Sequence, residues 1–395
     1  MSDTNRVGLR YIKEAAGTPG TTPSTGQLVA IPFTGSSDLG FTPETTTSSI
    51  IRSDREISDL VLVNASVGGG FDTELIAGNA LDNLLDGVLF SGTTLASQTA
   101  SVKVNSGSVT FTDVAGGTTL AGTGITSGVT VGGVVKVENA TETVIAPVTG
   151  VTGSTSITIS ASTTSAGATS GTTVTLLPSI SNGTTQSSYT MERTYRTDEG
   201  SDEFYEYLRG MVPGTFSMSA SASSIVEASF GFTGKTQKFE AQLGGSLTRP
   251  TAGAFSVYNA ASNVATIAIG GEPMGDNFVM EASIEIENNL RERNALGTLG
   301  AISIGAGEFS VTGSLNTYFN NSDLIAKVID NSETSLTLAF NSGDESIMFF
   351  LPRVKFSEGT PDVSGKNEDV MASISFQALR DNTLPNHTLT IAKTT

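Results

Sequence analysis

Residues 216–222 read FSMSASA, and this short stretch decides the fold class of the chain. Apolar and serine side chains alternate through it, so Phe216, Met218 and Ala220 point to one face of an extended strand while the serines point to the other. The same period of two recurs at three further places, which predicts half-buried antiparallel strands there as well. Those places are Phe309/Val311/Leu315, Leu336/Leu338/Phe340 and Val370/Ala372/Ile374/Phe376. A mainly β fold follows.

The composition of the 395-residue chain agrees with short strands joined by tight turns: 37% of the residues are apolar, 15% are charged and 44 are glycine. The net charge of -18 argues against binding nucleic acid through phosphate contacts, because such binding needs clustered lysine and arginine. The first residues form no apolar signal segment, and no apolar run is long enough to cross a membrane. We therefore expect synthesis in the cytoplasm and no membrane partner.

Side chains for catalysis or metal binding are scarce. There is no cysteine, and the one histidine, His387, lies in a turn, which nearly excludes a nucleophile activated by histidine and the usual zinc ligand sets. The run GFTGKTQ at residues 231–237 has part of a phosphate-binding loop, but Ser229 stands where the first glycine of that motif must be. We expect no enzyme activity, no catalytic residue, no cofactor and no bound metal.

Two segments differ from the alternating strands. Residues 14–45 contain many glycines and prolines and few periodic apolar positions, so residues 1–45 are predicted as an extended arm that lies on a neighbouring molecule, with a disordered arm as the alternative. Residues 93–183 carry few charges and much threonine, serine, glycine and valine in short alternating runs. This segment is predicted as an inserted small β-domain, with a flexible low-complexity segment as the alternative.

Two short helices are expected among the strands. The first follows Phe71, with Asp72 as its N-cap and Phe71 packed against Ile76 across its first turn. Its apolar positions at three- and four-residue spacing are Ala77, Ala80, Leu81, Leu84, Leu85 and Val88. The second helix follows Asn320-Asn321-Ser322, whose side chains suit an N-cap. The apolar side of that helix comprises Leu324, Ile325, Val328 and Ile329.

A weak internal repeat relates the two sides of the inserted segment. At one constant offset, Gly69 matches Gly307 and Phe71 matches Phe309; at another, Val226 matches Val370, Ala228 matches Ala372 and Phe232 matches Phe376. Each copy has the order strand, helix, strand, long loop, strand. We interpret residues 46–92 together with 184–250 as one small unit and residues 251–395 as a second.

Five short segments, in this order and spacing, resemble the major tail tube proteins of siphophages. They are RYIKEAAGTPGT (10–21), SDREISD (53–59), FDTEL (71–75), ENNLRER (287–293) and ISFQALRD (374–381). The resemblance covers nearly the whole chain outside residues 93–183. It implies a β-sandwich or barrel with one flanking helix per unit, and a virion protein whose units form sixfold rings that stack head to tail around a β-lined lumen.

Two units per chain would make three copies complete a pseudo-sixfold ring, whereas a single unit would require six copies. The resemblance further implies tail terminator and tail tip proteins as partners, with tape measure protein and double-stranded DNA held without sequence specificity in the lumen. The inserted segment would lie outside the ring as a decoration or an inter-ring contact.

Acidic residues offer two interpretations. Glu281, Glu285 and Glu287 fall on one face of a predicted strand, where they could line the lumen or form an outward, solvated face. A second acidic group could be lumenal, metal-binding or solvated, and we expect it to be solvated because it lacks the spacing of a calcium loop. That group comprises Asp198, Glu199, Asp202, Glu203 and Glu206.

Two other functions compete with a tail tube subunit. A bacterial surface or adhesin-like β-protein would suit the segment rich in serine, threonine and glycine, although no signal peptide supports it. A glycan-cleaving tail enzyme would need aromatic side chains along a groove, and the chain contains no tryptophan. The structural subunit is the interpretation that the order of motifs favours.

Overall fold

The computed structural model describes residues 7–35, 38–54, 56–93, 95, 102–115, 117–196, 203–251, 253, 255–274, 278–363, 365–366, 368–382 and 386–394. Within them the chain is mainly β, with two short α-helices. None of the helices in the described residues has the length and apolar character needed to span a membrane.

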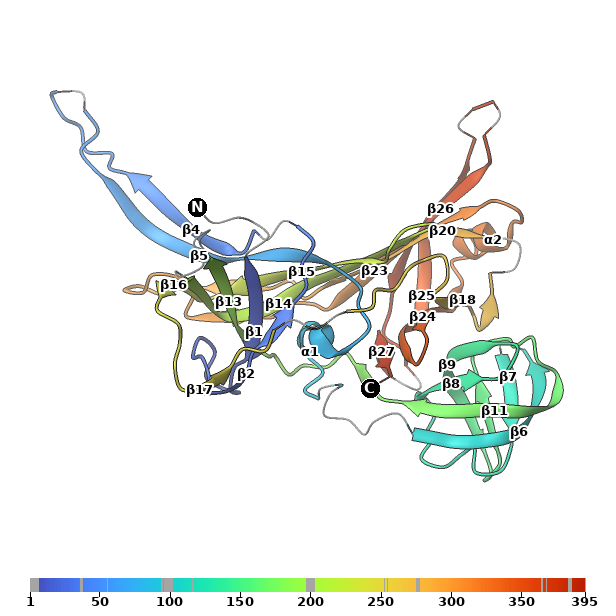
Figure 1. Cartoon of the computed structure of the whole chain (residues 1–395). Helices are drawn as coiled ribbons and strands as arrows, with labels where there is room; N and C mark the ends of the chain where they lie inside the picture. Colours follow the sequence, from blue (N-terminus) through green and yellow to red (C-terminus); the bar gives the residue numbers. More distant parts are fainter. Residues whose placement is uncertain are drawn as a thin grey trace.

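Eight antiparallel strands form one continuous sheet, here called the long sheet, across the width of the molecule (Figure 1). In spatial order they are β4 (Gly40–Thr47), β5 (Leu60–Glu74), β15 (Glu227–Gly234), β14 (Glu203–Ser221), β20 (Val279–Glu287), β23 (Ser310–Tyr318), β26 (Met371–Ala378) and β25 (Glu345–Asp362). The hairpin of β4 and β5 and the hairpin of β25 and β26 both project beyond it (Figure 1).

Two smaller flanking sheets form because β14 and β25 are long enough to belong to two sheets each. The first flanking sheet has the order β3 (Val29–Ile31), β1 (Gly8–Lys13), β13 (Tyr189–Arg196), β14 and β16 (Thr236–Glu240). The second has the order β19 (Glu272–Pro273), β18 (Val264–Ile269), β24 (Glu333–Ser342), β25, β27 (Thr390–Lys393) and β12 (Ser179–Ser181).

The main core lies between the long sheet and the flanking sheets. Phe216 of the long sheet stacks on Phe349 of the second flanking sheet with ring centroids 6.2 Å apart, and it also packs on Phe230 at 5.0 Å. Helix α1 (Asp82–Leu89), preceded by the 3-10 turn η2 (Asn79–Leu81), and helix α2 (Asp323–Ile329) accompany these sheets. Two small two-stranded sheets complete the chain outside the insert: β2 (Thr25–Gln27) with β17 (Ser246–Thr248), and β21 (Arg291–Arg293) with β22 (Ser303–Gly305).

The same order of strands and pairings occurs twice. The first strand set consists of β1, β3, β4, β5, β13, β14, β15 and β16 with α1, and the second consists of β18, β19, β20, β23, β24, β25, β26 and β27 with α2. Each pairing within the first set has its counterpart in the second. Even the β-bulges correspond, since the register shifts at Pro213/Thr215 on β14 and at Phe356/Glu358 on β25.

The pairing registers correct one of the two sequence alignments. Phe71 lies opposite Phe230, and Leu315 lies opposite Ile374. Phe71 therefore corresponds to Leu315 and not to Phe309, with which the sequence pattern matched it. The sequence match was fortuitous, because Gly69 and Phe71 lie within β5 whereas Gly307 and Phe309 precede β23.

The inserted segment is folded as a closed six-stranded barrel with its own apolar core. Its strands are β6 (Val102–Val114), β7 (Gly117–Ala121), β8 (Val134–Glu138), β9 (Thr143–Thr152), β10 (Ser156–Ile159) and β11 (Gly167–Leu177). A small apolar cluster docks it on the second flanking sheet, with Val134, Ile145 and Leu177 against Ala339, Met348, Phe350 and Ala392. In Figure 1 the barrel lies on the opposite side of the molecule from the two projecting hairpins.

The predicted start of the first helix was wrong. Phe71 and Asp72 lie within β5, which continues to Glu74 because β15 pairs with it along this length, and α1 begins only at Asp82. No side chain caps α1. All six predicted apolar helix positions are nevertheless buried. Ahead of α2, the Asn321 side chain accepts a hydrogen bond from the Asp323 backbone N–H at 3.1 Å.

The N-terminal segment pairs with strands of its own chain. β1 pairs with β13 and β3, β4 belongs to the long sheet, and the short β2 pairs with β17. Buried Glu14 fixes the turn after β1, because its carboxylate accepts hydrogen bonds from Ser188 Oγ at 2.6 Å, Thr190 Oγ1 at 2.8 Å and the Gly210 N–H at 2.9 Å. Residues 1–6 of the predicted arm lie outside the described residues.

Removing the barrel should expose the apolar cluster on the second flanking sheet. A short Gly/Ser linker in place of residues 102–177 can join the cut ends, because Val102 and Leu176 are register partners. Uncovering Met348 and Phe350 should cost about 1.5–3 kcal/mol each, seen as a lower melting temperature and increased binding of a hydrophobic dye.

The matched variant carries the same deletion with Met348→Thr and Phe350→Thr, and it should bind less dye because these positions then face water as polar strand residues. A deletion variant that melts like the full chain and binds no dye would show that the cluster contributes nothing.

Candidate functional site: the polar face of the long sheet

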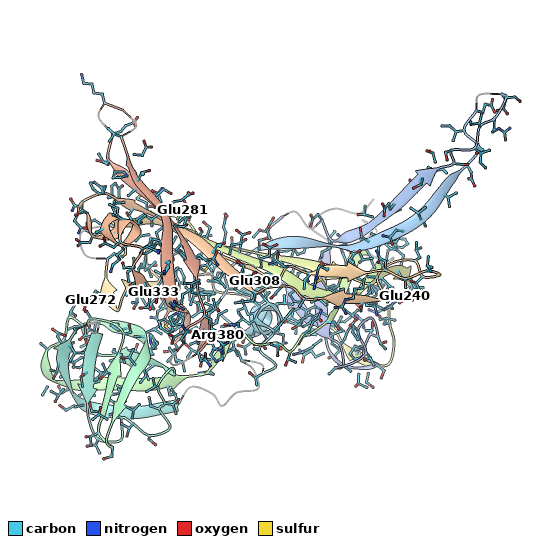
Figure 2. The ribbon with its side chains drawn as sticks, turned by 180° about the vertical axis from the view of Figure 1, so that it is seen from behind. Glu240, Glu272, Glu281, Glu308, Glu333 and Arg380 are labelled. Carbon is cyan, nitrogen blue, oxygen red and sulfur yellow. The ribbon has the colours of Figure 1, made fainter. Side chains whose placement is uncertain are left out.

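The two faces of β20 differ completely in character. Ala282, Ile284 and Ile286 are buried in the main core, and the alternate side chains point away from it. Those alternate residues are Glu281, Ser283, Glu285 and Glu287, of which Glu285 and Glu287 are exposed. Figure 2 shows Glu281 at the end of the sheet near the projecting β25–β26 hairpin.

Neighbouring strands continue this face with polar side chains. Glu285 lies between Ser217 of β14 and Thr312 of β23, and Ser283 lies between Ser219 and Ser314. The hydroxyls of Ser283 and Ser314 are hydrogen-bonded at 2.8 Å, and Ser219 Oγ donates to the Glu281 carboxylate at 3.3 Å. Because side chains alternate along every strand, one register gives the whole sheet a single polar face.

Negative charge dominates the polar face. The carboxylates that the pairing registers place there are Glu44, Asp72, Glu74, Glu227, Glu281, Glu285, Glu287, Glu358 and Asp362. Lys355 is the one basic side chain on the same face within the described strands of the long sheet. The face therefore lacks the clustered lysine and arginine that hold phosphate, and it repels polyanions at short range.

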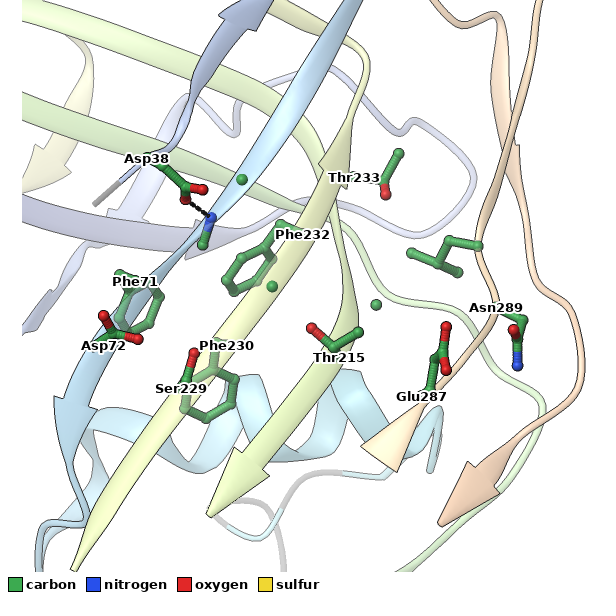
Figure 3. A pocket seen from close by; sticks show the side chains of 15 residues that line it. Asp38, Phe71, Asp72, Thr215, Ser229, Phe230, Phe232, Thr233, Glu287 and Asn289 are labelled. Atoms are coloured by element: carbon green, nitrogen blue, oxygen red, sulfur yellow. Dashed lines mark hydrogen bonds between the residues drawn. The ribbon is translucent and has the colours of Figure 1, made fainter. Parts of the chain in front are cut away.

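Glycines let the strands of this face approach one another closely. Gly69 has a φ of 108°, and a Cβ on it would lie 2.4 Å from the Asp38 backbone oxygen. A Cβ on Gly70 would lie 2.5 Å from the Phe230 backbone oxygen. The Asp38 carboxylate accepts a hydrogen bond from the Gly70 N–H at 2.5 Å (Figure 3). The triplet Gly68-Gly69-Gly70 thus serves close backbone packing, as its place in a strand predicts.

Two shallow depressions lie on the polar face, one of them beside Gly69 and Gly70. One of about 510 Å³ is bordered by Asp38, Asp72 and Glu287 (Figure 3), and one of about 540 Å³ by Asp72, Glu74 and Glu227. Neither has a histidine or cysteine among its lining residues, and no group of three or more metal-ligating side chains occurs among the described residues. The geometry favours an acidic surface rather than a catalytic centre.

In the second acidic group, the predicted solvated position was wrong for Glu206, whereas Glu203 is exposed. Asp198, Glu199 and Asp202 lie outside the described residues. Glu206 is buried, where it accepts hydrogen bonds from Arg193 Nε at 2.7 Å and Tyr195 Oη at 2.9 Å, while Glu203 pairs with Arg196 at 2.7 Å. Alternation along β14 puts Glu206 on the core-facing side, and the basic partner on β13 compensates its charge, which composition alone does not reveal.

The two end strands of the long sheet have open edges among the described residues. β4 pairs on one side with β5, and residues 357–362 of β25 pair on one side with β26. Open edges invite pairing with another chain, and soluble proteins normally cover or interrupt them. Edge strands with a polar face between them are features that sequence periodicity did not reveal, because they depend on the order of strands in space.

Comparison with known proteins identifies one family. The sequence model described as phage tail tube protein matches residues 4–378. No curated protein matches the chain.

Replacing Gly69 by alanine should destabilise the sheet. The positive φ should cost about 1–2 kcal/mol, and the overlap with Asp38 should add about 1–3 kcal/mol, measured by urea unfolding. Gly343→Ala is the matched control, because Gly343 also has a positive φ of 63° but open space around its Cβ position. Equal losses in the two variants would mean that close packing at Gly69 is unimportant.

Proposed function

The chain belongs to the phage tail tube protein family, a family of structural proteins of the virion tail, and from this premise we propose that its copies close into rings that stack head to tail as the tube of a long, non-contractile tail. The proposal rests on one observation above all: a continuous eight-stranded sheet with a polar, acidic face and two open edges. Such a sheet becomes a closed wall when the edges of adjacent copies pair.

The strand pairing that joins the two strand sets within the chain predicts the pairing that joins adjacent copies. β14 and β20 join the first strand set to the second, with Thr215 opposite Glu287 and Ser217 opposite Glu285. The equivalent strands at the open edges are β25 for β14 and β4 for β20. Carrying the registers over places Glu358 of one copy opposite Thr42 of the next, and Thr360 opposite Gly40.

Ring size follows from treating each strand set as one tube unit. The first strand set with α1 is the first unit, the second set with α2 is the second, and the barrel is an insertion into the first. Three copies then give six units around a pseudo-sixfold ring, and six copies remain the alternative. Head-to-tail stacking of rings uses unlike faces, so it continues without closing.

The polar face would line the channel in this arrangement. Glu281, Glu285 and Glu287 with the other carboxylates would keep the phosphates of passing DNA from adhering, over a range of about 8 Å at physiological salt. Tape measure protein and double-stranded DNA would occupy the channel in turn, with terminator and tip proteins at the tube ends. The barrel docks on residues that alternate with core residues of the second flanking sheet, so it would lie on the outer side.

A disulfide can test the joint between copies directly, because the chain contains no cysteine of its own. In the double variant Thr42→Cys/Glu358→Cys, directly opposed residues would have Cβ atoms about 4.5–5.5 Å apart, which is close to disulfide geometry. Mild oxidation should give crosslinked dimers and trimers on denaturing gels, with the series ending at three chains.

Each single-cysteine variant should stop at dimers, and Thr42→Cys/Thr360→Cys, two residues out of register, should crosslink much more slowly. A series that ends at six chains would establish the hexamer instead. The proposed pairing between copies would be refuted if the double-cysteine variant, at concentrations that form tubes, gave no more crosslinked product than the single-cysteine variants.

Reversing the charge of one row on the polar face should make tubes bind DNA. Glu281→Lys/Glu285→Lys/Glu287→Lys rings should retain a short duplex in fluorescence anisotropy at low salt, with affinity falling steeply as salt rises, by a slope of about -0.9 per phosphate contacted. The folded chain should persist, because these side chains point away from the core.

The corresponding glutamine variant is the control for lost negative charge without added positive charge. It should bind far more weakly than the lysine variant. Equal binding of duplex by unmodified tubes would contradict a non-adhesive channel.

A further inference from the structure

Three aromatic side chains form an exposed cluster, here called the aromatic cluster, at one end of the first flanking sheet. Phe204 is 58% exposed and Phe239 is 62% exposed, and Tyr195 stacks against Phe239 with ring centroids 6.5 Å apart. Tyr195 and Phe204 are register partners on β13 and β14. So much aromatic surface in contact with water is unfavourable for an isolated chain and marks an interaction site.

The second strand set shows the fate of the same positions when they are covered. Phe340 on β24 and Ile347 on β25 are register partners, as Tyr195 and Phe204 are in the first set. Ile391 on β27 lies opposite Phe349 of β25. In the first set, Phe239 on β16 lies in the same way opposite Glu206 of β14. The equivalents of Tyr195, Phe204 and Phe239 are therefore Phe340, Ile347 and Ile391. Their exposed fractions are 3%, 1% and 0%.

The cover on these equivalents comes from the first strand set and the segment that follows it. Tyr258 packs on Phe340 with ring centroids 6.2 Å apart. Asp82 at the start of α1 forms an ion pair of 2.5 Å with Lys393, two residues after Ile391 on β27. Both charged side chains are buried, so the contact between α1 and the end of β27 excludes water.

The second strand set has its own helix, α2, which packs on β25 of the same set but is much less buried than α1. Helix α1 is buried along nearly its whole length, whereas Leu324 is the one residue of α2 that is buried. Ile329 of α2 is 77% exposed, and the adjoining end of β25 is the open edge of the long sheet. One end of the chain thus carries an exposed aromatic cluster, and the other carries a helix with an exposed apolar residue, Ile329.

We propose that the aromatic cluster of one copy is buried by α2 and the adjoining end of β25 of a second copy, which repeats between chains the contact that α1 makes within the chain. This inference rests on the proposed ring, and it names the apolar side chains that hold the ring together beside the strand pairing. A second copy is the occupant because its helix stands in the position of α1 relative to an equivalent set of strands.

The test uses the Thr42→Cys/Glu358→Cys chain and measures the concentration at which half of the chains crosslink. Adding Phe204→Ser/Phe239→Ser should raise that concentration about 10-fold or more, as expected for aromatic residues at an interface centre. Ile329→Ser on α2 should weaken crosslinking too, and it avoids the sheet should the phenylalanine variant fail to fold. Val114→Ser is the matched control, because Val114 is an exposed apolar residue of the barrel at 39%.

Combining the changes on both surfaces decides whether they touch. If the cluster and α2 contact each other, Ile329→Ser should add much less on top of Phe204→Ser/Phe239→Ser than it does alone, whereas independent sites would multiply their effects. The inference would be overturned if folded variants of either surface crosslinked at the same half-crosslinking concentration as the parent cysteine chain. Fully multiplicative effects of the two sets of changes would overturn it too. Either result would leave the proposed ring unaffected. Failure of the parent cysteine chain to crosslink would instead refute the ring itself.

Discussion

The pairing of β14 with β20 is the contact on which the rest of the structure depends. It joins two strand sets of equal topology into one sheet, in a register that keeps the apolar side chains of residues 215–221 and 281–287 on the core side. If the pairing register shifted by one residue, Ile284 and Ile286 would face water and Glu285 would face the core. The free-energy cost of exposing the isoleucines and burying the carboxylate would be too large for another contact to offset. The single polar face and the two open edges both follow from this one joint.

The two strand sets share a topology but cover their outer faces differently. On the first flanking sheet the cover is polar, since buried Glu192 is bound by Arg249 at 2.7 Å and accepts a hydrogen bond from Tyr207 Oη at 2.9 Å. On the second, the corresponding side is apolar and carries the barrel. Burial raises the pKa of Asp86 on α1 to about 7, and its neighbour Asp82 is buried as well. The two strand sets thus have the same topology, although the side chains on their outer faces are polar in one set and apolar in the other.

Period-two alternation predicted the class of fold and the strand that carries Glu281, Glu285 and Glu287, and the internal repeat predicted the match of Phe232 with Phe376. It did not predict where β5 ends, because the pairing of Asp72 with Ser229 extends the strand over residues that also suit a helix start. Nor did it predict the burial of Glu206, which depends on Arg193 from another strand. The open edges and the aromatic cluster depend on strand order in space and on equivalence between sets, neither of which a local pattern contains.

The eight strands per chain also set the girth of any wall built from them. Three copies would supply 24 strands, which at the usual spacing and a tilt of about 40° give a circumference of roughly 150 Å and a backbone diameter near 48 Å. Side chains would narrow this bore to roughly 35–40 Å, enough for a hydrated duplex with its counterions. Six copies would double the girth and leave a bore of roughly 85 Å, far wider than one duplex needs. In the proposed three-copy ring, the number of strands in the long sheet would therefore match the size of the channel to the width of a duplex.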